Sequence, residues 1–470
     1  MSLTQKLGKR GRFAKVSFHK AGSEVLFMNP IAIQLNDIIN KGNPYIMEML
    51  SEIGKNLFFP KGILSQSAEA KEKAYKINAT LGIAKEQGRV MHFDSVVSSI
   101  KEIRPRDSLT YAPSFGIPDL RKIWQQSQFE KNPSLSGKAT SMPVVTCGIT
   151  HAISVFADVW VDPGNVIILP DMMWGNYNLI LNVRKKARIS KYPIFSEKGE
   201  YNLKAFEEKV KDEAKKHEKI IVLLNFPHNP TGYTLSEKEA DSIVKILIDV
   251  AEEGTNIIVV SDDAYFGLFY EEGILKESIF ARLNGQHPRL LAVKLDGATK
   301  ENFVWGLRVG FITYGCQTED DSGNIYDALE RKTAGAIRGS ISNASHLGQS
   351  IILKSMQHEK YPEEKMEKFE ILKNRAMRVK EVLSDSRYKD AWDVYPFNSG
   401  YFMCIRPKRV DAEKLRLHLL EKFGVGLISM GESNLRIAFS CLEEEDIPEL
   451  FDIILKGIED LRSGVGDQGL

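Results

Sequence analysis

The chain has 470 residues, of which 43% are hydrophobic and 27% charged, an ordinary composition for a globular protein with two or three domains or one large α/β domain with additions. Its 63 basic and 62 acidic residues give a formal net charge of +1, so the charge balance offers no argument for a nucleic-acid or membrane-surface partner. No apolar run approaches the roughly 18 residues that cross a bilayer, and the first residues lack the apolar region of a secretory signal, so we expect a cytoplasmic protein.

The first 90 residues are the least informative part of the chain, and we expect them to contribute to a small domain. Helices are predicted near Tyr45–Gly54 and over Ser65–Ile77, where capping residues and good helix formers end at a loop over residues 78–82. Tyr111 opens the sequence Tyr-Ala-Pro-Ser-Phe-Gly, in which proline and glycine force an irregular turn before a helix beginning near Pro118. This turn is expected to display Tyr111 on a rigid loop.

Residues 91–340 are predicted to form a large α/β domain, because from about Val144 strands alternate with helices, as in a parallel sheet covered by helices on both faces. Helices are expected at Leu203–Lys216 and Ser236–Glu252. The predicted strands are Val144–Thr146, Val166–Leu169, Ile220–Leu224, Ile257–Ser261, Leu290–Leu295 and Val309–Tyr314. Ligands bind at the carboxyl ends of such strands, and the polar motifs here follow the strands, so one shared pocket is expected.

Residues 341–470 are predicted to form a smaller α+β domain. A long charged helix is expected over residues 362–386, with further helices at Ala412–Lys422 and Glu443–Leu461. Short strands are expected at Trp392–Tyr395, Tyr401–Ile405 and Asn434–Phe439. Because no Gly/Ser linker separates the halves, continuous structure is expected to join the two domains.

Lys300 lies between two of the predicted buried strands, after the apolar run Leu290–Leu295 and the small residues Gly-Ala-Thr. An ammonium group is costly to desolvate, so an amine held there should have a lowered pKa, as a nucleophilic or Schiff-base lysine needs. A solvated turn lysine is the simpler interpretation, and partners elsewhere in the sequence must decide between the two.

Two loops after predicted strands have the chemistry of ligand-binding turns. Gly148-Ile149-Thr150 opens an apolar helix, whose free N–H groups and dipole can hold an anion with the Thr150 hydroxyl as an added donor, although Thr150 could be a simple helix cap. In Asn225–Gly232, two prolines and a glycine constrain the backbone and hold the Asn229 amide in place; a plain β-turn is the alternative.

Charged residues at three further places complete the candidate set. Asp262 and Asp263 end a strand, where their carboxylates must face water, a cation or a protonated nitrogen; helix capping is the alternative. If one of them binds a planar ligand, Tyr265 could contact another atom of that ligand. Arg308 stands between glycines, as suits a closely approached phosphate. Arg436 interrupts an apolar strand and needs a carboxylate partner. A salt bridge within the protein is the alternative for either arginine.

Together these features resemble the class I/II aminotransferases, pyridoxal-phosphate enzymes of fold type I in the aspartate aminotransferase superfamily. The resemblance covers roughly residues 78–439 and rests on motifs in the family's order and spacing, namely Asn229-Pro230-Thr231-Gly232, Asp262-x-Ala264-Tyr265, Lys300 after Gly-Ala-Thr, Arg308 eight residues later, and Arg436. It implies a fold type I large domain, a smaller α+β domain, and pyridoxal 5′-phosphate as cofactor.

The resemblance also implies a role for each residue. Lys300 would form the Schiff base with the cofactor and then move a proton, while Asp262 would keep the pyridine nitrogen protonated and Tyr265 would hydrogen-bond the phenolic oxygen. Further cofactor contacts would come from Asn229, Trp174, Arg308, Thr150, Thr299 and the backbone of Gly148 and Ile149. Many relatives carry a serine where this chain has Gly297, so one phosphate contact is expected to be missing.

Substrate and partner expectations follow from the same resemblance. Arg436 would bind the substrate α-carboxylate, with Asn176 and Gly82 beside the substrate. Tyr111 matches a tyrosine that reaches the cofactor phosphate of a neighbouring subunit, which implies a homodimer with shared active sites. Arg338 lies where relatives that use dicarboxylates place a second arginine, so aspartate or glutamate with 2-oxoglutarate would become substrates if it enters the pocket; a surface or interface salt bridge is the alternative.

The expected activity is transfer of the amino group of an L-amino acid to a 2-oxo acid. A lyase that carries out β-elimination on the same fold is an alternative, and so is a non-catalytic regulator that binds pyridoxal phosphate. Regulators of that type usually add a DNA-binding helical domain, and no basic recognition module precedes residue 78. The four cysteines, far apart and without a CxxC pair, disfavour a zinc site, so no metal is expected.

Overall fold

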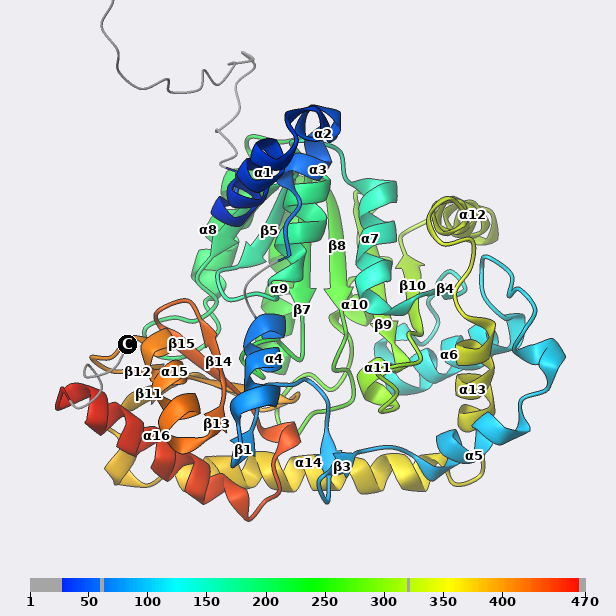
Figure 1. Ribbon diagram of the computed structural model, residues 1–470. Helices are drawn as coiled ribbons and strands as arrows, with labels where there is room; N and C mark the ends of the chain where they lie inside the picture. The colour runs from blue at the N-terminus through cyan, green and yellow to red at the C-terminus, as the bar shows by residue number, and fades with distance from the viewer. Residues whose placement is uncertain (1–27, 60–62, 319–321, 465–470) are drawn as a thin grey trace, which may run out of the picture. The chain divides into compact units, whose positions relative to one another are not determined.

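The computed structural model describes residues 28–59, 63–318 and 322–464, which fall into two compact units divided after Asn56 (Figure 1). The first unit consists of helices α1 (Pro30–Gly42), α2 (Pro44–Met49) and α3 (Glu52–Asn56). The single helix predicted near Tyr45–Gly54 is therefore wrong in extent, because the backbone becomes extended at Leu50 and splits it into α2 and α3. The predicted absence of a secretory signal concerns residues 1–27, which lie outside the described residues.

A seven-stranded sheet forms the centre of the second unit, in the order β4-β10-β9-β8-β7-β5-β6. Its strands are β4 (Val144–Thr146), β5 (Val166–Pro170), β6 (Arg188–Tyr192), β7 (Lys219–Asn225), β8 (Asn256–Asp262), β9 (Leu290–Gly297) and β10 (Gly310–Gly315). All neighbours run parallel except β10, which is antiparallel to both β4 and β9. The predicted, mostly parallel sheet is thus present, with β6 as an additional edge strand.

Both faces of this sheet are buried, which explains why β7 and β8 are almost continuously apolar in sequence. Ile220 and Val222 pack with α8 (Leu203–Ala214) and α9 (Glu237–Glu252), whereas Ile221 and Leu223 pack in the other core with α7 (Gly148–Trp160). Other helices of this part are α5 (Asp94–Glu102), α6 (Pro118–Lys131), α10 (Ile279–Leu283), α11 (Ala298–Glu301), α12 (Ser322–Ser340) and α13 (His346–Gln357).

A second, antiparallel sheet has the order β11-β12-β15-β14 and lies against the C-terminal helices. Its strands are β11 (Trp392–Val394), β12 (Phe402–Pro407), β14 (Ile428–Met430) and β15 (Asn434–Ala438), and its helices are α15 (Ala412–Phe423) and α16 (Asp446–Arg462). The N-terminal side adds α4 (Ile63–Lys73) and β1 (Ile77–Asn78), which pairs with β13 (Val425–Gly426). The predicted helix over Ser65–Ile77 therefore ends early, because Ile77 belongs to a strand. A short hairpin of β2 (Lys85–Glu86) and β3 (Arg89–Val90) follows.

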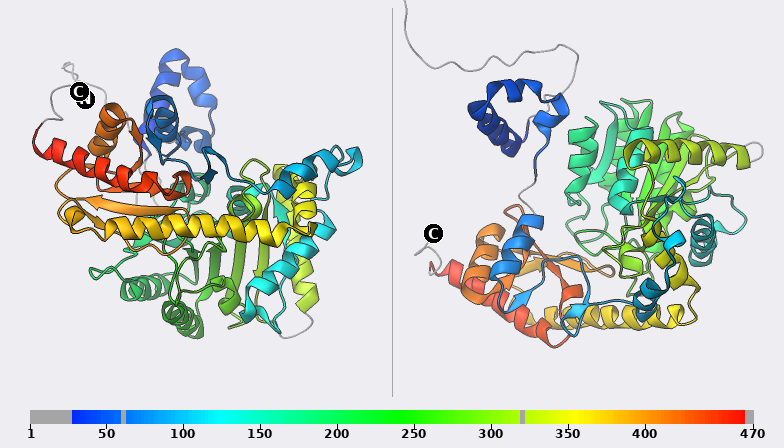
Figure 2. Two further views of the ribbon diagram at one scale, coloured as in Figure 1. Left: turned by 90° about the horizontal axis from the view of Figure 1, so that it is seen from below. Right: turned by 45° about the vertical axis from the view of Figure 1, so that its right-hand side comes forward.

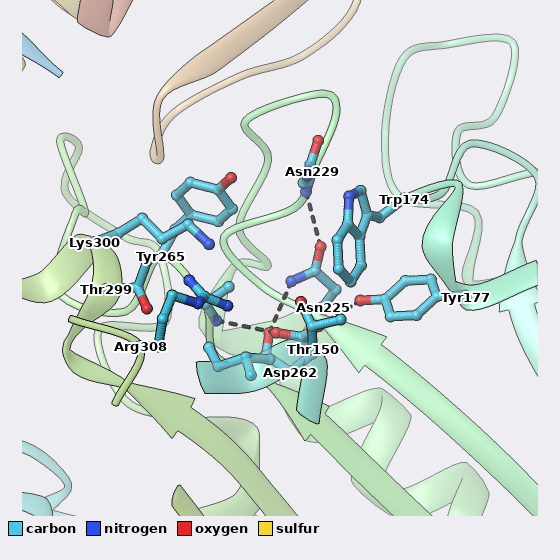
Figure 3. Close-up of a pocket in the computed structure, with 12 residues that line it drawn as sticks. Thr150, Trp174, Tyr177, Asn225, Asn229, Asp262, Tyr265, Thr299, Lys300 and Arg308 are labelled. Atoms are coloured by element: carbon cyan, nitrogen blue, oxygen red, sulfur yellow. Dashed lines mark hydrogen bonds between the residues drawn. The ribbon is translucent and has the colours of Figure 1, made fainter. Parts of the chain in front are cut away.

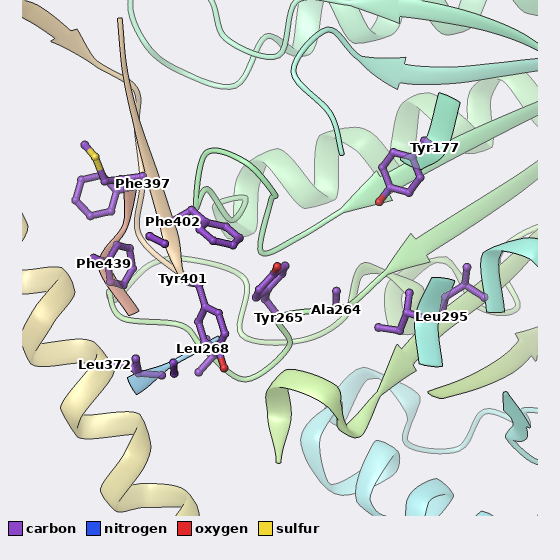
Figure 4. Close-up of a cluster of buried hydrophobic side chains, with 14 of the residues drawn as sticks. Tyr177, Ala264, Tyr265, Leu268, Leu295, Leu372, Phe397, Tyr401, Phe402 and Phe439 are labelled. Atoms are coloured by element: carbon purple, nitrogen blue, oxygen red, sulfur yellow. The ribbon is translucent and has the colours of Figure 1, made fainter. Parts of the chain in front are cut away.

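The two sheets are joined by the long helix α14 (Tyr361–Leu383), which runs from the large sheet to the small one (Figures 1 and 2). One cluster of buried hydrophobic side chains, many of them aromatic, also continues from one sheet to the other (Figure 4). In it Tyr265, just after β8, packs edge-on against Phe402 of β12, with ring centroids 5.5 Å apart. Within the described ranges no helix is both long and apolar enough to cross a membrane. The domain boundaries at residues 90 and 340 and the cytoplasmic location stay predictions.

Candidate active site

The carboxyl ends of β7, β8 and β9 meet at one edge of the large sheet, where a pocket opens (Figure 3). Register brings Asn225 at the end of β7 beside Asp262 at the end of β8. The short helix α11, directly after β9, places Lys300 in the same pocket. The pocket is lined by Ile149, Thr150, Trp174, Tyr177, Asn225, Asn229, Asp262, Ala264, Tyr265, Thr299, Lys300 and Arg308.

The surroundings of Lys300 favour, on balance, the neutral form of its amine. Burial lowers the pKa of its amine to about 8, with Asp262 opposing the shift and Arg308 adding to it. The amine lies 5.0 Å from the centre of the Tyr265 ring. Its backbone carbonyl accepts a hydrogen bond from the Tyr401 hydroxyl at 3.3 Å. An amine with this pKa is partly unprotonated near neutral pH and can attack a carbonyl carbon.

Asp262 is held by donors on several sides. The Tyr177 hydroxyl donates to Oδ2 at 2.6 Å, the Ala264 N–H donates to Oδ1 at 3.1 Å, and the Asn225 side chain donates to the Asp262 carbonyl at 2.8 Å. Burial raises the pKa of Asp262 to about 6, and the hydrogen bond from Tyr177 limits that rise. The carboxylate is therefore mostly ionised at pH 7 and can pair with a protonated ring nitrogen.

An anion cradle lies at the start of α7. Gly148 has φ = +75°, and a side chain there would come within 2.6 Å of an Arg308 guanidinium nitrogen, so the backbone and the guanidinium touch. Arg308 Nη1 donates to the Trp305 carbonyl at 3.1 Å, and no ion pair joins Arg308 to a carboxylate among the described residues. The buried Thr299 hydroxyl also lacks a partner there. Free donors around a helix N-terminus suit a phosphate group.

Gly297 stands three residues before Lys300 for a steric reason. A Cβ atom at this position would lie 2.8 Å from the Val309 carbonyl oxygen and 2.9 Å from the Gly310 Cα, because β9 and β10 approach closely there. Serine cannot be accommodated without moving a strand. The hydroxyl missing from the sequence is thus a consequence of how these two strands pack.

Arg436 of β15 is buried without an anionic partner among the described residues. Its Nη2 donates to the Thr80 carbonyl at 2.9 Å and its Nη1 reaches Asn229 Oδ1 at 3.4 Å, while Nε has no partner. The guanidinium carbon lies 4.2 Å from the centre of the Phe402 ring. Gly82 is next to this group, because a Cβ there would be 3.2 Å from Phe402. A buried, incompletely paired guanidinium is suited to bind a carboxylate.

Six of the predicted site residues do not line the pocket of their own chain. Gly148, Gly82 and Arg436 lie beside the lining residues Arg308, Tyr265 and Asn229. The other three are Tyr111, Asn176 and Arg338. Tyr111 is 89% exposed on the loop before α6, Asn176 is half-buried beyond Trp174, and Arg338 is exposed and donates to Ser342 Oγ at 2.6 Å. Sequence reasoning missed Tyr177 and gave Asn225 no role. A strand-end position matching that of Asp262 could have singled out Asn225, whereas no sequence signal marked Tyr177.

Known proteins with related sequences show which family the chain belongs to. The sequence model described as aminotransferase class I and II matches residues 81–454. The chain belongs to the class I and II aminotransferases. This confirms the resemblance seen in the sequence, and the residues that line the pocket fall within the matched range.

Individual relatives of this aminotransferase-family chain are distant. A probable N-acetyl-LL-diaminopimelate aminotransferase of Bacillus subtilis is 27% identical over 46% of this chain and 50% of its own length. An aspartate aminotransferase of Pyrococcus horikoshii is 25% identical over 74% of this chain and 83% of its own length. The chain spans only 50%, 63% and 62% of the first three curated relatives it matches.

Solved structures confirm the fold type I architecture. An aminotransferase from Anaerococcus prevotii superposes with a TM-score of 0.77 at 24% identity, covering 87% of this chain and 99% of that one. A kynurenine aminotransferase of Pyrococcus horikoshii, solved in complex with PMP, superposes with a TM-score of 0.73 at 18% identity, covering 88% and 98%. At these identities the likeness establishes the fold alone.

Proposed function

We propose that this chain is a pyridoxal 5′-phosphate-dependent aminotransferase that moves the amino group of an L-amino acid to a 2-oxo acid. The observation that carries the proposal is one pocket that holds the Lys300 amine, with a pKa of about 8, together with Asp262 and the Arg308 cradle. The buried Arg436, without an anionic partner among the described residues, supplies the place for a substrate carboxylate.

The residues present fit the cofactor. The unpartnered Thr299 hydroxyl and the contact between Gly148 and the Arg308 guanidinium suit its phosphate, together with Thr150 and the Ile149 backbone. The ionised Asp262 suits a protonated pyridine nitrogen. When bound, the cofactor supplies an aldehyde carbon that takes up an amine and a ring that withdraws electrons from the substrate Cα.

Each side chain then has a task of its own. Once a substrate amine has displaced Lys300 from the cofactor, the neutral Lys300 amine would take the proton from the substrate Cα and deliver it to the carbon that was the cofactor's aldehyde. Asp262 would hold a proton on the ring nitrogen, Tyr265 and Asn229 would hydrogen-bond the ring oxygen, and Trp174 would pack against the ring. Arg436 binds the α-carboxylate, with Gly82 and Asn176 beside the substrate, and so orients the Cα–H bond toward Lys300.

A homodimer is part of the proposal, since an exposed apolar surface surrounds Tyr111. Its side chains are Leu109, Tyr111, Val97, Ile100, Ile341 and Leu347, on α5, on the loops before α6 and α13, and on the first turn of α13, where the Thr110–His346 hydrogen bond joins two of these elements. Tyr111 and Arg338 would then act in the partner's pocket, where Arg338 would select a dicarboxylate such as aspartate or glutamate with 2-oxoglutarate.

Mixing the Lys300→Ala and Tyr111→Ala variants tests whether the two subunits share their active sites, because a mixed dimer would contain one site with both residues intact. Partial recovery of activity is expected, and none would refute shared sites.

The function is tested by following the absorbance of the loaded protein while single amino acids are added. Conversion of the cofactor to its amine form, with stoichiometric release of the matching 2-oxo acid, is the expected result. Release of ammonia, with the cofactor returned unchanged, would show a lyase instead. No spectral change with any amino acid would support a non-catalytic protein and refute the proposal.

A further inference from the structure

A group of buried charges lies beneath the turn that carries Lys300, outside the pocket lining. Asp263 and Glu301 directly follow Asp262 and Lys300 in sequence, and both are buried. Asp263 pairs with Lys294 of β9, whose amine also lies 3.6 Å from Asp296. None of these charges touches the pocket, so the proposed function leaves them unexplained.

Glu301 is the part of this group closest in sequence to Lys300, and two lysines hold it. Lys131, at the end of α6, and Lys365, in the first turns of α14, both pair with its Oε1, the second at 2.6 Å. The Glu301 side chain is only 3% exposed. Burial alone raises the pKa of Glu301, but the two lysines outweigh burial and bring it down to about 2. The carboxylate is thus ionised and held from two sides throughout the working pH range.

Helix α14 receives a second bond from the same turn. The Asn302 side chain donates to the Tyr361 hydroxyl at 3.0 Å, so consecutive residues after Lys300 are both tied to the first turns of α14. Tyr361 and Lys365 are four residues apart and therefore lie on one side of the helix. The Lys300 turn is consequently held in two ways. The strand before it holds it through the backbone, and the side chains of Glu301 and Asn302 tie it to α14.

Farther along, α14 holds the segment after the strand that carries Arg436. Arg375, which is 2% exposed, donates to the Ser440 carbonyl at 3.0 Å and to the Glu443 carboxylate at 2.6 Å. Ten residues of helix, about 15 Å at 1.5 Å per residue, separate Lys365 from Arg375. One rigid element therefore connects the turn of Lys300 with the end of β15.

We propose that Glu301 is a positioning residue for Lys300, and that its ion pair with Lys365 couples the Lys300 turn through α14 to the strand that carries Arg436. The inference rests on the proposed function for the roles of Lys300 and Arg436. Buried ion pairs contribute little net stability compared with apolar packing, but their geometry is specific. Proton transfer from the substrate Cα depends on that geometry, since a displacement of about 1 Å can lower a rate on the order of 100-fold.

The test uses the double variant E301Q/K365M, which removes one charge of each sign and so leaves the net charge around Lys300 unchanged. The other charges that face Lys300, Asp262 and Arg308, are untouched. The first readout is competitive acetylation of Lys300 in the cofactor-free protein across a pH series, followed by mass spectrometry. A loosened turn admits water, so the pKa of Lys300 is expected to rise from about 8 toward its ordinary 10.5.

The second readout is steady-state kinetics of the loaded double variant. We expect kcat to fall roughly 10- to 100-fold while KM for the amino acid changes less than about threefold, because the Arg436 side chain itself is unchanged. The matched control is R121M/E330Q, which removes a similarly buried ion pair, 2.6 Å long, between α6 and α12. Its Lys300 pKa and kcat should equal those of the parent.

Tyr361→Phe keeps the outcome clear if the double variant fails to fold, because it cuts the Asn302 bond without altering charge. It should raise the Lys300 pKa in the same direction by a smaller amount. A Lys300 pKa and kcat at the parent values in both sets of variants would overturn the proposal. A parent protein that lacks transaminase activity would refute the proposed function instead, since the acetylation readout needs neither cofactor nor turnover.

Discussion

Replacing Tyr177 with phenylalanine removes the hydroxyl that donates to Asp262 Oδ2 at 2.6 Å. The substitution changes little else, since the phenylalanine ring has the shape of the buried tyrosine ring. A hydrogen bond to a charged group contributes roughly 1.5–3 kcal/mol, and one pH unit corresponds to about 1.4 kcal/mol. The loss should therefore raise the pKa of Asp262 by about one to two pH units above its present value of about 6.

The direction of the change in cofactor affinity depends on whether the ionised or the protonated form of Asp262 binds the cofactor. A carboxyl with a raised pKa is ionised only above that pKa, and only the ionised form pairs with a protonated ring nitrogen. At pH 7 the parent Asp262 is mostly ionised, whereas in Tyr177→Phe roughly half or more is protonated. The affinity for pyridoxal phosphate at pH 7 should consequently fall by about two- to tenfold, and the difference should shrink by about pH 9.

The assay is a pH series of cofactor dissociation constants, measured by quenching of tryptophan fluorescence in the cofactor-free protein. Tyr192→Phe is the matched control, because Tyr192 is equally buried and its hydroxyl bonds Tyr201 in the other core of the large sheet. It should leave the pH dependence unchanged. If the acidic fall in affinity occurs at the same pH in Tyr177→Phe as in the parent, the Tyr177 bond does not control the ionisation of Asp262.

Three further substitutions probe other parts of the site. Lys300→Ala should abolish conversion of the cofactor to its amine form in stopped-flow absorbance, and turnover at the parent rate would contradict the role of the amine. Arg436→Lys should raise KM for the amino acid by roughly 10- to 100-fold through loss of two-point carboxylate binding, with a KM near the parent value as the contrary result. Gly297→Ser should lower the free energy of unfolding in urea by about 1–3 kcal/mol, because its Cβ would meet the Val309 carbonyl. The control Gly306→Ser has open space around it and should leave that free energy unchanged. Equal unfolding curves for the two variants would remove the steric explanation for Gly297.

The large sheet could be predicted from sequence because its parallel strands are buried on both faces and therefore appear as apolar runs. β7 and β8 were identified to within two residues, and the polar residues that follow them proved to lie at one edge. β6 was missed since it is only partly buried and its sequence, Arg-Ile-Ser-Lys-Tyr, is half polar. The break at Leu50 was missed because helix-forming residues lie on both sides of it.

The separation of the two carboxylates at 262 and 263 could not be predicted from sequence. Asp262 is the last residue of β8 and reaches the pocket, while Asp263, the residue after the strand, pairs with Lys294 outside the pocket lining. Which face holds the pocket depends on how the sheet is covered. The neighbouring sequence contains no sign of that arrangement.

The sequence by itself determined the family, the main strands and the chemical types at the site, because motif residues next to apolar strands are local features of the chain. Only the tertiary structure decided how those residues are supported. Tyr177 reaches Asp262 across 85 residues and Lys365 reaches Glu301 across 64, and such pairs depend on the packing of helices and loops against the sheet. The strand approach that excludes a side chain at Gly297 is decided in the same way, by contact with a neighbouring strand rather than by adjacent sequence.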